Sequence, residues 1–183
     1  MDDIRRRAPL AYWSRADNAR FNARFLSQSA ESPADSKLAN YIGYKGIQRV
    51  SLYEGFIREA GLSLELILKA IIAQMNENGS HPDKSKTLPM IHDLPKLWDR
   101  SGLPAPSVDE RKLLTHMKWN IQWAARYPAP TNLQARLNQD SELEKLGVPT
   151  AGNLSQLWQL DWESFDDVYT IAVEHFWGLR LKA

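Results

Sequence analysis

Apolar residues recur at helical spacing along most of the chain, and most strongly between Gly61 and Met75. In that stretch one broad helical face is formed by Leu64, Ile67, Leu68, Ile71, Ile72 and Met75. Glu65 and Lys69 lie four residues apart within it, one helical turn from each other. A charged pair in so apolar a helix is either an exposed strip or a feature that the fold requires.

The same spacing indicates further helices elsewhere in the chain. The predicted segments are 10–27, 38–75, 93–102, 107–125, 133–146 and 162–179. Four glycines at positions 43, 46, 55 and 61 interrupt the second segment, and each costs up to about 1 kcal/mol in a helix interior. Kinks or breaks are therefore expected at these glycines.

Local signals also mark where helices begin and end. Asp93 and Gly102 are residue types that cap the two ends of a helix, and Ser107 followed by Glu110 is a capping box. No segment alternates apolar and polar residues as a half-buried strand would. The sequence therefore predicts an all-α protein, an up-down bundle of about five helices in a single domain, residues 1–183.

Composition excludes several classes of site. The chain has 183 residues and no cysteine, which rules out disulfides, thiolate nucleophiles and cysteine zinc sites.

No apolar run reaches bilayer-spanning length, and the N-terminus lacks the apolar stretch of a signal peptide, so we expect a cytoplasmic protein with no membrane association. The net charge of +1 is far from that of a dedicated nucleic-acid binder. The seven tryptophans are expected in a core or an interface.

Common catalytic motifs are also absent. There is no glycine-rich phosphate loop, no histidine pair with zinc spacing and no serine nucleophile flanked by glycines. The four histidines are scattered at positions 81, 92, 116 and 175. We therefore expect no metal site and no cofactor.

Three short motifs occur in an order that is informative. They are Glu65-Leu-Ile-Leu-Lys69 on the second predicted helix, His92-Asp-Leu94 after a polar loop, and Arg126-Tyr-Pro128 after the fourth helix. In this order they resemble the HEPN superfamily, the higher-eukaryote and prokaryote nucleotide-binding domains, over roughly residues 10–130. On this resemblance the residues of a binding site or fold motif are Glu65, Lys69, His92, Arg126 and Tyr127. Residues 131–160 then form an insertion before the last helix.

The resemblance implies a helical bundle that forms a homodimer. Many members are metal-independent ribonucleases of prokaryotic defence or toxin–antitoxin systems. Others are non-catalytic modules that bind a nucleotide or a partner protein encoded nearby, such as a nucleotidyltransferase. The catalytic members use an arginine and a histidine four to six residues apart, and Arg111 and His116 have that spacing.

The chemistry of such a pair fits RNA cleavage. A histidine can act as general acid or base in attack of a ribose 2′-hydroxyl on the adjacent phosphate, and an arginine can stabilise the developing charge. On one helix, however, Arg111 and His116 would lie about 140° apart around the axis. Pairing across a dimer is therefore expected, rather than pairing within a protomer.

Three functions remain open at this point: a ribonuclease using Arg111 and His116, a non-catalytic module, and a helical scaffold whose tryptophans form an interface. The motif residues also have structural interpretations. His92 can be a packing residue at a helix start, and Arg126 can complement the negative end of a helix. Glu65 and Lys69 would contribute only about a few tenths of a kcal/mol if exposed, but if buried each would need its partner.

Overall fold

The computed structural model describes residues 8–30, 36–82, 88–124, 133–148, 150–151, 154–155 and 160–182. Its helices are α2 (Pro9–Ala30), α3 (Ser36–Tyr41), α4 (Gln48–Glu77), α5 (Leu94–Arg100), α6 (Val108–Trp119), the π turn η2 (Asn120–Ala124), α7 (Leu133–Lys145) and α8 (Trp162–Arg180). Two short strands, β1 (Thr150–Ala151) and β2 (Leu154–Ser155), pair antiparallel between α7 and α8. The predicted all-α bundle is confirmed. None of the described helices combines the length and the hydropathy needed to cross a membrane.

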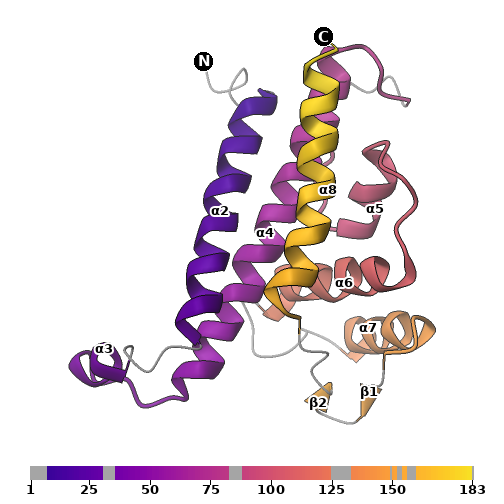
Figure 1. Ribbon diagram of the computed structural model, residues 1–183. Helices are drawn as coiled ribbons and strands as arrows, with labels where there is room; N and C mark the ends of the chain where they lie inside the picture. The colour runs from indigo at the N-terminus through magenta and orange to yellow at the C-terminus, as the bar shows by residue number, and fades with distance from the viewer. Residues whose placement is uncertain are drawn as a thin grey trace.

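The long helix α4 is the element around which the others pack. It has 30 residues, and it contacts α2, α8, α5 and α6. Figure 1 shows α2 and α8 running alongside it, with α5 and α6 on the other side of α8 in this view. The predicted central position of the Gly61–Met75 segment is therefore confirmed, since that segment is the second half of α4.

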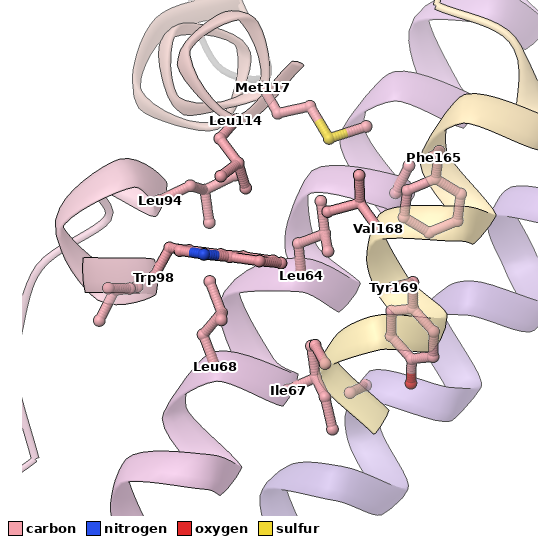
Figure 2. Packing of buried hydrophobic residues seen from close by; sticks show 14 of the residues in the cluster. Leu64, Ile67, Leu68, Leu94, Trp98, Leu114, Met117, Phe165, Val168 and Tyr169 are labelled. Atoms are coloured by element: carbon pink, nitrogen blue, oxygen red, sulfur yellow. The ribbon is translucent and has the colours of Figure 1, made fainter. Parts of the chain in front are cut away.

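The core lies where α4, α5, α6 and α8 meet. Figure 2 shows Trp98 of α5 beside Leu64 and Leu68 of α4. From α8, Phe165 and Tyr169 enter the same core and are fully buried. Burial of large side chains such as these is the main contribution to the stability of the fold.

Gly55 and Gly61 do not break α4, so that part of the prediction is wrong. A Cβ atom at Gly55 would lie 3.2 Å from Cδ1 of Leu26, and one at Gly61 would lie 2.8 Å from Cγ1 of Ile121. Each glycine therefore allows a neighbouring helical segment to approach α4 closely. A break does occur around Gly43, whose φ of +68° is typical of glycine, and it separates α3 from α4.

The predicted caps are confirmed. The Asp93 side chain accepts a hydrogen bond from the backbone N–H of Lys96 at 3.1 Å, and Gly102 follows α5 with a φ of +70°. At the start of α6, Ser107 and Glu110 make both hydrogen bonds of the capping box. These contacts fix where the chain leaves the loops and thereby place the residues at the start of α5 and α6.

Candidate functional site

Glu65 and Lys69 lie on the buried side of α4. The exposed fractions of their side chains are 6% and 11%, and Lys69 Nζ donates to Glu65 Oε1 at 2.7 Å. The exposed-strip interpretation is therefore wrong. Because a buried charge is costly without its partner, each of the two residues requires the other.

His92 completes this first group of charges. Its Nδ1 lies 2.9 Å from Glu65 Oε2, so the two carboxylate oxygens bind donors from two different segments. An ionised carboxylate can only accept, and Nδ1 therefore carries the hydrogen. The His92 side chain is 49% exposed, which leaves its other nitrogen, Nε2, for solvent or a ligand. Three of the five predicted motif residues are thus brought together.

A second group of charges adjoins the first. Lys118 Nζ of α6 is buried and lies 2.7 and 2.9 Å from the two carboxylate oxygens of Glu142 in α7. The same Nζ lies 3.5 Å from Oδ2 of Asp93, the neighbour of His92 in the chain. Trp119 Nε1 also donates to Glu142, at 3.0 Å. We refer to Glu65, Lys69, His92, Asp93, Lys118 and Glu142 together as the polar centre.

Sequence reasoning missed Lys118 and Glu142. Lys118 lies one turn after Leu114 and therefore on a buried side of α6, which is a signal that the apolar pattern contains. Glu142 has no such signal, because it is 24 residues further along the chain and reaches Lys118 only through the placement of α7. Asp93 was predicted as a helix cap, and it also serves as an ion-pair partner.

The predicted catalytic pair lies on α6, outside the polar centre. The Arg111 guanidinium binds the Asp99 carboxylate of α5 through two nitrogens, at 2.8 and 3.3 Å. His116 is partly buried, and this burial lowers its pKa below the usual value. Within the described residues no hydrogen bond or ion pair joins Arg111 to His116.

The other predicted motif residues, Arg126 and Tyr127, lie outside the described residues. Among the residues that are described, no group of three or more histidines and carboxylates could hold a metal ion. The positive charges of Lys69 and Lys118 are each matched by at least one carboxylate within the polar centre. Chemically, the polar centre can therefore orient His92, but it does not present an unmatched lysine to a phosphate.

Comparison of the chain with protein-family models, with curated proteins and with solved structures gave no match. The resemblance to HEPN domains therefore rests on the order of the three sequence motifs. Two of those motifs meet in space, through Glu65, Lys69 and His92. The function has to be argued from the chemistry of these residues and of the pair on α6.

Proposed function

We propose that the protein is a HEPN-like helical module that binds a partner protein and does not cleave RNA through Arg111 and His116. The observation that carries the proposal is the bidentate contact of Arg111 with Asp99. A guanidinium whose two nitrogens already bind a carboxylate would have to give up that contact before it could stabilise charge on a phosphate. This contact supports the proposal, because Arg111 would have to leave Asp99 before it could act on RNA.

The surroundings of His116 support the same proposal. The histidine is partly buried, and burial disfavours its charged form, so a bound phosphate gains no positive charge from it at neutral pH. In addition, Arg111 and His116 point in directions about 140° apart around α6. One protomer therefore does not present both groups to a single RNA phosphate.

As a binding module, the protein would act beside another protein of a prokaryotic defence or toxin–antitoxin system. A nucleotidyltransferase encoded nearby is the partner that the resemblance suggests. A nucleotide is the other ligand class that the resemblance implies. The matched charges of the polar centre favour a protein partner over the polyanionic phosphate chain of a nucleotide.

The experiment is an RNA cleavage assay in the presence of EDTA. It compares the wild-type protein with Arg111→Ala and His116→Ala, and we expect no cleavage above that of buffer for any of the three. In parallel, co-expression with the protein encoded beside it should yield a complex of fixed stoichiometry. Cleavage by the wild type that both substitutions abolish would overturn the proposal.

One observation favours a second candidate, a metal-independent endoribonuclease that uses His92. A buried carboxylate that orients a half-exposed histidine is an arrangement suited to a general base. In that case cleavage in EDTA should be lost in His92→Gln and retained in Arg111→Ala. The same assay therefore distinguishes the two candidate centres.

A further inference from the structure

Large apolar side chains are exposed in the segment that connects α2 to α4. Between residues 37 and 50, those that are at least two-fifths exposed are Leu38, Tyr41, Ile42, Tyr44, Ile47 and Val50. We refer to these six residues as the α3 apolar surface. They come from α3, from the loop after it and from the first turn of α4. Figure 1 shows α3 projecting from the end of the bundle where α2 ends and α4 begins.

Local contacts hold the backbone of this segment in a defined turn. At the end of α3 the N–H of Gly43 donates to the carbonyl of Asn40 at 3.1 Å, and the N–H of Tyr44 donates to that of Ala39 at 2.9 Å. Together with the positive φ of Gly43, these bonds form a Schellman motif. The Tyr44 ring lies against Gly46, where a Cβ atom would collide with it. The segment therefore has a defined local structure that leaves its apolar side chains in water.

One face of α3 carries the most exposed part of this surface. Leu38, Tyr41 and Ile42 are three and four residues apart, which is the spacing of neighbours on a helix, and Tyr41 is 88% exposed. Single exposed apolar side chains are normal, whereas a continuous group of them is typical of an interaction site. The neighbouring residues of the same chain do not cover this face.

The charges of the segment are all positive. From 36 to 53 the chain carries Lys37, Lys45 and Arg49 and no acidic residue. All three are exposed, and within the described part of the chain none of them forms an ion pair with a carboxylate. The next acidic residue, Glu54, follows one turn after Val50 on α4. The lysines of the polar centre, by contrast, are matched within the fold. The segment thus combines apolar side chains with positive charge that is free to attract a carboxylate.

We propose that the α3 apolar surface binds an acidic amphipathic segment of the partner protein. The apolar residues of that segment contact Leu38, Tyr41 and Ile42, and its Asp and Glu side chains pair with Lys37 and Lys45. The inference deepens the proposed function, on which it rests, by naming the chemistry through which the partner is recognised.

The same features disfavour other occupants. A second copy of the chain using this surface would bring two sets of basic side chains into one interface, where like charges repel. A single-stranded nucleic acid needs aromatic side chains on which its bases stack, but four of the six apolar side chains are aliphatic. An acidic amphipathic segment is complementary to both the aliphatic and the basic side chains.

The first test measures the binding of two synthetic helical peptides by fluorescence anisotropy. Both carry leucine along one face, and the remaining positions are glutamate in one peptide and lysine in the other. The wild type should bind the glutamate peptide at least about tenfold more tightly than the lysine peptide. Leu38→Ser/Ile42→Ser should weaken that binding at least about tenfold. Leu133→Ser/Leu137→Ser on α7, a pair with the same spacing and also exposed, is the matched control and should bind as the wild type does.

The second test reverses the charges. Lys37→Glu/Lys45→Glu/Arg49→Glu should bind the lysine peptide more tightly than the glutamate peptide. Because all of these side chains are exposed, circular dichroism and the thermal midpoint of each variant should match those of the wild type. Binding of neither peptide by the wild type, equal binding of both, or a preference that charge reversal does not change would overturn the proposal.

Two further ligands distinguish a protein segment from other anionic surfaces. Oligouridylate and vesicles that contain phosphatidylserine are measured beside the glutamate peptide, and tighter binding of either would overturn the proposal. In co-expression with the protein encoded nearby, Leu38→Ser/Ile42→Ser should prevent the complex and the α7 control should not. A complex that forms equally with both variants would overturn this inference and agree with the proposed function. RNA cleavage that requires Arg111 and His116 would contradict the proposed function without changing the peptide measurements.

Discussion

Glu65 is the residue at which two segments of the chain converge, because its oxygens bind Lys69 within α4 and His92 just before α5. Burial of this carboxylate costs several kcal/mol, and the two donors offset that cost. The loop between α4 and α5 is thereby tied to the middle of α4.

Removal of one member of the Glu65–Lys69 ion pair should strongly destabilise the protein. For Lys69→Met we expect a loss of about 3 kcal/mol in the free energy of unfolding, because Glu65 stays buried with only His92 beside it. Urea denaturation measures the loss. Glu65→Leu/Lys69→Met should cost less than the sum of the two single substitutions, since it leaves no unpaired charge. A cost below about 1 kcal/mol for Lys69→Met would show that the pair is not a requirement of the fold.

Burial of His116 predicts a pH dependence. Its pKa is lowered by burial from the ordinary 6.5, so the unfolded chain binds more protons than the folded one between the two pKa values. Its contribution to stability is therefore complete above pH 6.5 and declines as the pH falls toward the lowered pKa. His116→Gln removes this contribution and should lose less stability than the wild type between about pH 7.5 and about pH 5. Equal losses in the two proteins would contradict the prediction.

At the residue scale, the sequence predicted contacts between near neighbours but not between distant ones. The Glu65–Lys69 pair follows from helical spacing, and His92 was grouped with it by the motif order. Arg111 was assigned to catalysis because spacing alone does not reveal Asp99, twelve residues earlier, as its partner. Ion pairs across loops depend on the placement of helices, which spacing along one helix does not contain.

At the scale of helices and strands, too, local signals were predicted correctly and tertiary contacts were not. The helical spacing of apolar residues and the capping residues predicted the helical segments to within a few residues, because these signals act within one turn of the chain. The glycines of α4 were misjudged, since helix propensity describes an isolated helix. At Gly61 the missing Cβ provides space for Ile121 of η2, which is a tertiary contact.

A matched pair of glycine substitutions distinguishes the effect of helix propensity on stability from the effect of packing. Gly61→Ala should destabilise the protein by about 1–3 kcal/mol, because the new Cβ would lie 2.8 Å from Ile121 Cγ1. Gly178→Ala in α8, where a Cβ meets no atom within 4 Å, should instead stabilise it by up to about 1 kcal/mol. Thermal unfolding of both variants provides the measurement. Stabilisation by Gly61→Ala would contradict the close approach of η2 to α4.

At the scale of the whole molecule, the fold divides into a packed set of helices and the segment that carries α7. Among the described residues of this segment, Leu143 and Val148 are buried, and Glu142 binds Lys118 of α6. Residues 131–160 were predicted as an insertion on the HEPN resemblance. That prediction can be tested by removing most of this segment.

Replacement of residues 131–159 by a flexible linker should leave a protein that unfolds cooperatively. Its stability should fall by up to about 3 kcal/mol, because Lys118 loses Glu142 and keeps only the 3.5 Å contact with Asp93, and Lys118→Met should recover part of the loss. Removal of 162–183 is the control and should abolish cooperative unfolding, since Phe165, Tyr169 and Phe176 are core residues. Absence of a cooperative transition in the linker variant with Lys118→Met would show that the segment is not an insertion.

The alanine stripe of α2 has a consequence for local motion. The buried apolar side chains of α2 are alanines, and its larger ones, Tyr12, Trp13 and Leu26, are only partly buried. On α8, by contrast, Phe165, Tyr169 and Phe176 are fully buried, so docking of α2 removes less apolar area from water than docking of α8. Opening of α2 should therefore require less free energy than unfolding of the whole chain. Backbone amides of α2 should then exchange with deuterium faster than those of α4.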